Sequence, residues 1–145
     1  MRKIEAMSLS DSIIKLGIFS SLRTIHDDQY LIALQEIGRG LLVKNTHIFY
    51  GGGDSGAMGV IPRIFAERGG KVVGIDCKRF NDKYGSQDFG TTVVHDTFSA
   101  RQEGLIEACD TVLCLPGGVG TLSEIFDVIV SNDLNIVKRR IILFN

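Results

Sequence analysis

The stretch LPGGVGTLSE, residues 115–124, decides the fold that this sequence predicts. It follows directly on a short, almost wholly apolar run, TVLCL at 111–115, which is typical of a buried parallel strand. After it, apolar residues return at helical spacing. A strand that turns through glycines into a helix leaves unpaired backbone N–H groups at the positive end of the helix dipole. The stretch therefore predicts an anion site, most naturally for phosphate.

The same order of strand, glycine turn and helix occurs earlier in the chain. Residues 47–50 predict a strand that runs into GGGDSG at 51–56, and a helix is expected over 57–68. The polar segment 77–91 is expected to be a long surface loop. The hydrophobic patterns elsewhere predict strands at 14–19, 71–76, 92–94 and 140–144 and helices at 27–43 and 99–109.

Alternating strands and helices predict one α/β domain, a Rossmann-like doubly wound fold with a mainly parallel sheet of about six strands and helices on both faces. We expect residues 13–145 to form this domain and residues 1–12 to form an N-terminal tail. Ligands bind such sheets beyond the carboxyl ends of the strands. Both glycine turns, the Ser20-Ser21 turn and the segment 94–101 leave from that edge, so they can converge on one ligand.

Composition excludes several classes of function. The 145 residues carry a net charge of −1 and no long basic block, which argues against nucleic acid as a partner and favours a small molecule. No apolar run approaches the roughly 20 residues of a membrane span. The three cysteines lack metal-ligand spacing, so no metal site is predicted and a cytoplasmic location fits best. Neither glycine turn has the motif of a dinucleotide site or of a P-loop.

Two charged residues have competing interpretations. Thr121 and Glu124 have the spacing of a capping box at a helix start, in which the glutamate folds back onto its own helix. Glu124 is otherwise a carboxylate at the predicted anion site. Arg101 lies near the start of its helix, where a cation opposes the dipole, so it either serves a ligand or is a solvated arginine paired with a neighbour such as Glu103.

The two glycine turns resemble those of a known family. Residues 49–59 (FYGGGDSGAMG) look like its Y-G-G-G-x-x-G-x-M-G turn, and residues 115–124 match its P-G-G-x-G-T-x-x-E signature. The family is the LONELY GUY-type phosphoribohydrolases, often labelled lysine decarboxylases. The resemblance extends from about residue 15 to residue 145 and implies cleavage of the N-glycosidic bond of cytokinin riboside 5′-monophosphates or AMP, without a cofactor.

The resemblance also implies roles for individual residues. Glu124 matches the catalytic carboxylate of the family and Arg101 its catalytic arginine. The phosphate and nucleotide would be held by residues of the three turns, namely Ser20, Ser21, Gly52, Gly53, Met58, Gly117, Gly118, Gly120 and Thr121. Relatives form homodimers or larger assemblies, and we expect the same here.

The chain departs from the family pattern at several positions. Phe19 replaces a glycine before the Ser20-Ser21 turn, Gln102 replaces a lysine after Arg101, and Phe98 replaces a methionine. Relatives continue past residue 145 with further helix, so this chain is either a shortened form or a reduced member of the family. The alternative function is a binding or carrier protein for a phosphorylated, nucleotide-like ligand, as in molybdenum-cofactor carriers with the same P-G-G-x-G-T turn. Such a carrier needs the glycines but not the Arg101 and Glu124 pair.

Overall fold

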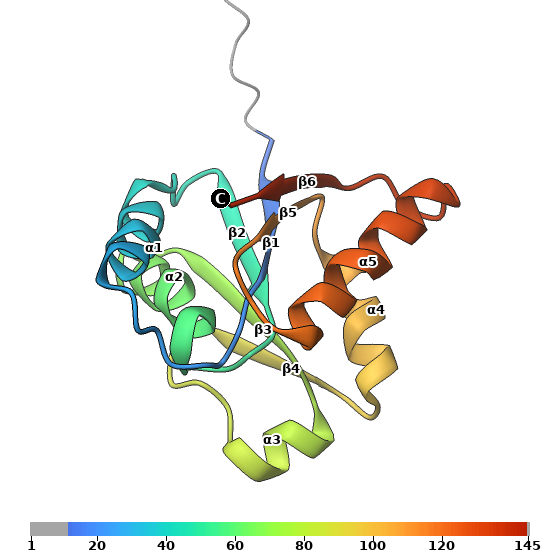
Figure 1. Ribbon diagram of the computed structural model, residues 1–145, viewed down its shortest axis with the longest axis horizontal. Coiled ribbons are helices and arrows are strands. Elements are labelled where there is room, and N and C mark those ends of the chain that lie inside the picture. The colour runs from blue at the N-terminus through green and yellow to red at the C-terminus, as the bar shows by residue number, and fades with distance from the viewer. Residues whose placement is uncertain (1–11, 145) are drawn as a thin grey trace, which may run out of the picture.

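The computed structural model describes residues 12–144, so the predicted N-terminal tail lies outside the described residues apart from Ser12. Within this part of the chain, strands and helices alternate from end to end (Figure 1). Their order is β1 (Ile14–Phe19), α1 (Asp28–Gly40), β2 (Thr46–Tyr50), α2 (Gly56–Glu67), β3 (Lys71–Cys77), α3 (Lys78–Tyr84), β4 (Thr91–His95), α4 (Phe98–Ala108), β5 (Thr111–Cys114), α5 (Val119–Asp133) and β6 (Arg140–Leu143).

The strands form one six-stranded sheet in the order β4-β3-β2-β1-β5-β6, and every neighbouring pair is parallel. The chain moves outward from β1 to β4 and then returns through α4 to β5 on the other side of β1. Helices α1 and α2 cover one face of the sheet, and α4 and α5 cover the other (Figure 1). The predicted Rossmann-like doubly wound fold is confirmed, with its topological switch point between β1 and β5.

Two hydrophobic cores hold the layers together, because successive strand residues point to opposite faces of the sheet. Ile18 of β1 packs toward α1 and α2, whereas its neighbour Phe19 packs toward α4 and α5. The first core is completed by residues such as Leu34, Ile48, Ile61 and Phe65, and the second by residues such as Val73, Leu105, Val112 and Val128.

The prediction of a long loop over residues 77–91 is wrong in part. Residues 78–84 form the short helix α3, which ends at Gly85 with a φ of 73°. None of its residues is buried, so the helix has no apolar face that a periodic pattern could reveal. The loop prediction applies only to the stretch that follows it.

The remaining predicted elements differ from the structure only at their ends. Helix α5 begins at Val119, inside the glycine turn rather than after it. None of the helices within residues 12–144 is long and apolar enough to cross a membrane.

Candidate active site

Three turns meet at the carboxyl ends of β1, β2 and β5. The backbone N–H of Leu115 donates to the carbonyl oxygen of Phe19 at 2.9 Å, and that of Met58 donates to the carbonyl oxygen of Ser21 at 3.0 Å. The Ser20-Ser21 turn therefore lies between the two glycine turns, as the position of β1 between β2 and β5 requires. The hydroxyl of Ser20 is buried and has no hydrogen-bond partner among the described residues.

The second glycine turn leads straight into the N-terminus of α5. Gly118 is the N-cap residue of α5, and no side chain forms a capping hydrogen bond at this end of the helix. The first intrahelical bond runs from the N–H of Leu122 to the carbonyl oxygen of Gly118 at 3.0 Å, so the N–H groups of residues 119–121 have no partner within the helix. A Cβ at Gly117 would overlap Oγ1 of the buried Thr121. These unpaired donors can bind an anion.

Arg101 and Glu124 form a buried ion pair between α4 and α5. Nη1 of Arg101 donates to Oε1 of Glu124 at 3.1 Å, and the two residues are only 4% and 7% exposed. Nη2 of Arg101 also donates to the carbonyl oxygen of Gly51 at 3.3 Å. The guanidinium group thus joins the first glycine turn to the helix that begins at the second.

Burial and the neighbouring charge act in opposite directions on the carboxyl group of Glu124. Removal from water raises the pKa of the Glu124 carboxyl group, and the neighbouring Arg101 guanidinium opposes that rise. Nε of Arg101 is buried and has no hydrogen-bond partner among residues 12–144. A carboxylate and a cation with a spare donor are therefore held together where a ligand of this sheet would bind.

The structure decides between the competing interpretations of these residues. The capping-box interpretation is wrong, because α5 begins at Val119 and Glu124 is more than a turn inside the helix, paired with Arg101. The interpretation of Arg101 as a solvated residue paired with Glu103 is also wrong, because Arg101 is buried and its ion-pair partner is Glu124.

The first glycine turn needs glycine for steric reasons. Gly52 has a φ of +84°, and a Cβ at Gly53 would overlap the side chain of Leu22. Sδ of Met58 lies 3.2 Å from the position that a Cβ at Gly51 would take. Gly51 and Gly53 thus pack against Met58 and Gly52 against Asp76, whereas Gly120 faces open space at the start of α5.

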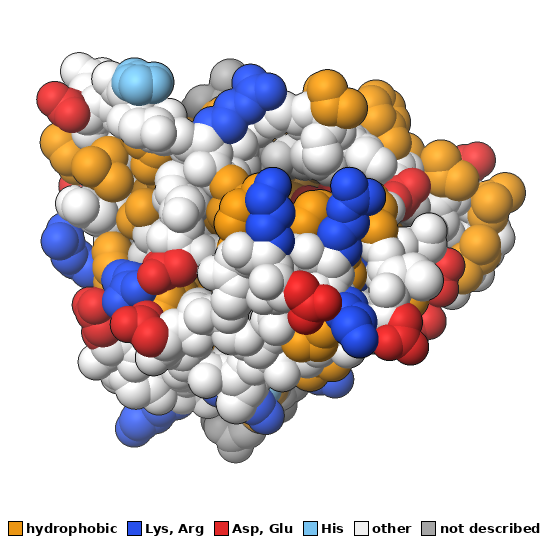
Figure 2. Space-filling model, turned by 90° about the horizontal axis from the view of Figure 1, so that it is seen from below, with side chains coloured by type: hydrophobic (Ala, Val, Ile, Leu, Met, Phe, Trp, Pro, Cys, Tyr) orange, Lys and Arg blue, Asp and Glu red, His pale blue; other side chains and the backbone are white. Residues whose placement is uncertain are grey.

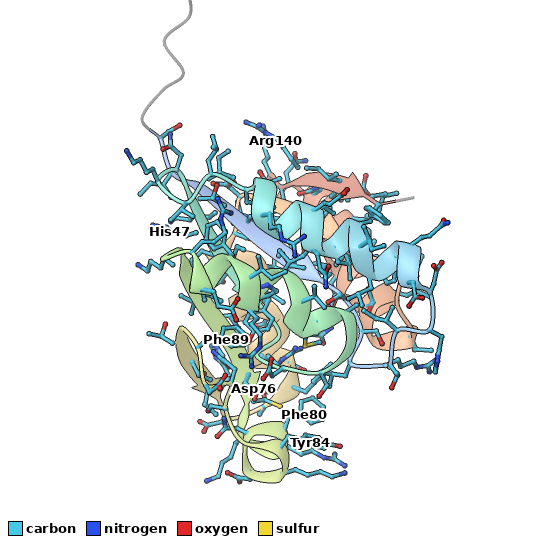
Figure 3. The ribbon with its side chains drawn as sticks, turned by 90° about the vertical axis from the view of Figure 1, so that its left-hand side faces the viewer. His47, Asp76, Phe80, Tyr84, Phe89 and Arg140 are labelled. Atoms are coloured by element: carbon cyan, nitrogen blue, oxygen red, sulfur yellow. The ribbon has the colours of Figure 1, made fainter. Side chains whose placement is uncertain are left out.

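Two residues that the sequence motifs do not mark also lie at this edge. The guanidinium carbon of Arg23 is 3.4 Å from the position of a Cβ at Gly118, which brings this exposed cation to the N-terminus of α5. Asp76, the last residue but one of β3, is buried, and its Oδ1 accepts the N–H of Cys77 at 2.8 Å; Figure 3 labels its position. No pattern in a single sequence marks Arg23, because its place depends on the path of the loop after β1.

The described part of the chain, residues 12–144, holds no group of three His, Cys, Asp or Glu residues arranged to bind a metal ion. The three cysteines, Cys77, Cys109 and Cys114, are buried and are not joined in disulfides. The polar groups at the sheet edge are therefore the carboxylate, guanidinium, hydroxyl and backbone groups described above.

Among the curated proteins that are similar to this chain, three are named as cytokinin riboside 5′-monophosphate phosphoribohydrolases, one of them as a probable one. The chain is 30% identical to LOG5 of Arabidopsis thaliana over 80% of its length, and 32% identical to the Rhodococcoides fascians protein over 75%. It is 28% identical to the probable enzyme LOGL6 of rice (Oryza sativa subsp. japonica) over 98%. These matches cover 51%, 56% and 58% of the respective relatives, so the chain spans little more than half of their length.

Solved structures share the fold. A protein solved as structural-genomics target TM1055 has a TM-score of 0.69 and 24% identity, covering 81% of this chain and 69% of that one. The molybdenum-cofactor (Moco) carrier protein of Chlamydomonas reinhardtii has a TM-score of 0.68 and 17% identity, covering 91% and 76%. At these identities the likeness establishes the fold alone.

A family model described as "possible lysine decarboxylase" matches residues 58–145, which is more than half of the chain. The matched region includes Arg101, Glu124 and the second glycine turn. The chain therefore belongs to the possible lysine decarboxylase family, which is the LONELY GUY family that its two glycine turns resemble.

Proposed function

We propose that this protein is a phosphoribohydrolase that cleaves the N-glycosidic bond of a nucleoside 5′-monophosphate, either a cytokinin riboside 5′-monophosphate or AMP. The products are the free base and ribose 5-phosphate. The observation that carries this proposal is the buried ion pair of Arg101 and Glu124 beside an unpaired helix N-terminus. The three relatives named after this activity support it.

The carboxylate suits the chemistry of the sugar. Cleavage of a glycosidic bond passes through an oxocarbenium-like ribose that carries positive charge. A Glu124 carboxylate beside the ribose stabilises that charge and orients the attacking water. Because the carboxylate is buried, its electrostatic effect is stronger than it would be in water.

The cation suits the chemistry of the base. When the glycosidic bond breaks, the bonding electrons go to the base, which becomes an anion or takes up a proton. The Arg101 guanidinium stabilises that negative charge, and its spare Nε–H is a donor that no described residue uses. The phosphate binds the N–H groups at the start of α5, with Gly117, Gly118, Gly120 and Thr121, and Arg23 adds a second positive charge there. The rest of the nucleotide, next to the phosphate, is lined by residues of the other two turns, namely Ser20, Ser21, Gly52, Gly53 and Met58.

The alternative function is a non-catalytic carrier of a phosphorylated ligand. The structural likeness to a molybdenum-cofactor carrier concerns the fold alone. A carrier needs the glycine turns but gains nothing from a charged pair, and desolvating two charges costs stability. Retention of the buried Arg101 and Glu124 pair therefore favours the enzyme.

We also propose that the protein works in the cytoplasm as a homodimer or larger homo-oligomer. The outward face of α5 exposes Leu122, Phe126, Ile129 and Val130 at helical spacing. Contiguous apolar side chains of this kind are typical of an interface, and a second copy would cover them. Light scattering after gel filtration should give a molar mass at least twice that of one chain. The Phe126→Glu variant should have the mass of a single chain.

The activity is tested by product analysis. The wild-type protein and Glu124→Gln are incubated with AMP and with isopentenyladenosine 5′-monophosphate, and released base and ribose 5-phosphate are measured by chromatography. We expect the substitution to lower kcat/KM by at least about a hundredfold, which is about 2.7 kcal/mol of transition-state stabilisation. Release of no base from either substrate, while ribose 5-phosphate still raises the melting temperature, would instead support the carrier.

A further inference from the structure

Two phenylalanines from different helices meet beside the ion pair. Phe80 of α3 and Phe98 of α4 contact each other with ring centroids 6.0 Å apart and ring planes at 85°. Both rings remain partly in water, with Phe80 37% and Phe98 43% exposed. Figure 3 shows Phe80 on α3, just beyond the buried Asp76 at the end of β3.

Phe98 connects this aromatic pair to the proposed catalytic groups. Its ring centroid lies 5.7 Å from the guanidinium carbon of Arg101, within the range of a cation–π contact. Its backbone is fixed at the start of α4, where the hydroxyl of Thr97 accepts the N–H of Ala100 at 3.1 Å. A chain of contacts therefore leads from buried Arg101 through the ring of Phe98 to that of Phe80.

Exposed aromatic rings beside buried charges suggest a ligand with both an apolar and a polar end. Figure 2 shows the corresponding face of the molecule, where hydrophobic side chains lie among lysines and arginines. If the ribose lies at Arg101 and Glu124 and the phosphate at α5, the base is the part of a nucleotide that extends beyond Arg101. A base has a π-face that contacts aromatic side chains favourably whatever its substituents.

We propose that Phe80 and Phe98 form the wall of the site that contacts the nucleobase, so that the aromatic base, and not only the ribose phosphate, contributes to binding. This rests on the proposed function for the position of the ribose and phosphate. Helix α3, which exposes Phe80, thereby becomes part of the site.

The test compares two ligands that differ by the base. The first is formycin 5′-monophosphate, an analogue of AMP whose carbon–carbon glycosidic bond is not hydrolysed. The second is ribose 5-phosphate, which has no base. Dissociation constants of both are measured by calorimetry for the wild-type protein, Phe80→Leu and Phe98→Leu. Leucine keeps apolar bulk but removes the ring.

We expect each substitution to weaken binding of formycin 5′-monophosphate by about tenfold, or about 1.4 kcal/mol. Binding of ribose 5-phosphate should change by less than twofold, which also shows that the variant is folded. Tyr84→Leu is the matched control, because Tyr84 is an exposed aromatic residue of α3 that contacts Lys83 rather than the phenylalanine pair. It should bind both ligands as the wild type does.

The proposal is overturned if the wild type binds formycin 5′-monophosphate no more tightly than ribose 5-phosphate. It is also overturned if the phenylalanine variants lose affinity for both ligands equally, or for neither. Its failure is distinct from failure of the proposed function. If the wild type hydrolyses AMP but the variants bind formycin 5′-monophosphate as the wild type does, only the proposal of the aromatic wall fails. If binding depends on the base but no substrate is hydrolysed, only the proposed enzymatic function fails.

Discussion

The guanidinium group of Arg101 rests on the backbone of Gly51 and donates a hydrogen bond from Nη2 to its carbonyl oxygen at 3.3 Å. The contact is so close that a Cβ at Gly51 would overlap Nη2. Gly51 lies in the first glycine turn, fifty positions before Arg101. The glycine therefore determines where the cation of the proposed site lies, although it carries no functional group of its own.

Gly51→Ala is expected to displace the Arg101 guanidinium and to weaken its pairing with Glu124. Because misplacement of about 1 Å costs about a hundredfold in rate, we expect a loss of that order in kcat/KM for AMP hydrolysis. Gly40→Ala is the matched control, since Gly40 is the last residue of α1, has no place in the proposed site, and a Cβ there meets nothing within 4 Å. Its kcat/KM should stay close to that of the wild type, and equal activity of both variants would contradict the prediction.

Glu124 should make stability depend on pH in a recognisable direction. Burial raises its folded pKa above the ordinary 4.5, so between 4.5 and the folded pKa the folded protein binds more protons than the unfolded chain. The free energy of unfolding that Glu124 contributes therefore falls as pH rises through this window, and is constant above it.

Urea unfolding at a series of pH values checks this. The free energy of unfolding of the wild type minus that of Glu124→Gln isolates the carboxyl group, because the other titrations cancel. We expect this difference to decrease as pH rises from about 4.5. A difference that increases with pH would mean that Arg101 stabilises the carboxylate more than burial destabilises it.

The sequence was sufficient to predict the fold because its strands are short apolar runs that end at glycine turns, as at residues 111–118. Helix α3 was missed because none of its residues is buried and so no apolar face marks it. For α5, the apolar residues 122, 125, 126, 129 and 130 did mark a helix, but only Ile125 packs against the second core, and the other four are exposed on the outward face. The face toward the rest of the molecule carries Thr121, Glu124 and Val128.

The candidate site was predictable only where a motif covers it. Arg101 and Glu124 were selected by resemblance, and the structure pairs them over 23 positions of sequence. Whether Glu124 was a helix cap depended on where α5 begins, which the pattern left open by a few residues. Arg23 and Phe80 belong to no motif. The loop after β1 brings Arg23 beside Gly118, and the position of α3 brings Phe80 into contact with Phe98.

Two of the cysteines should be unreactive in the folded protein. Burial raises the pKa of both Cys109 and Cys114 to about 11, so few of these thiols are ionised at pH 8. We expect neither to react with Ellman's reagent within minutes under native conditions, and both to react at once in urea. Rapid labelling of either residue in the native protein, identified by mass spectrometry, would show that the face of the sheet under α4 opens readily.

Arg23 is predicted to strengthen binding of the phosphate group. Its guanidinium lies beside Gly118 at the N-terminus of α5, and it is exposed, so the phosphate can approach it from solvent. We expect Arg23→Ala to raise the dissociation constant of ribose 5-phosphate by about fivefold to tenfold, because a charge-assisted hydrogen bond is lost at a solvated site. The kcat for AMP should change little, since the phosphate contact is the same in substrate and transition state.

A control variant at a distant arginine and a series of salt concentrations separate a direct contact between Arg23 and the phosphate from a general loss of positive charge. Arg140→Ala removes an exposed arginine at the opposite end of the sheet (Figure 3) and should leave ribose 5-phosphate binding unchanged. The difference between wild type and Arg23→Ala should shrink as salt is raised from about 0.01 to 1 M, where the Debye length falls from about 30 to 3 Å. If both arginine variants weaken binding equally, Arg23 acts only through net charge and does not contact the phosphate.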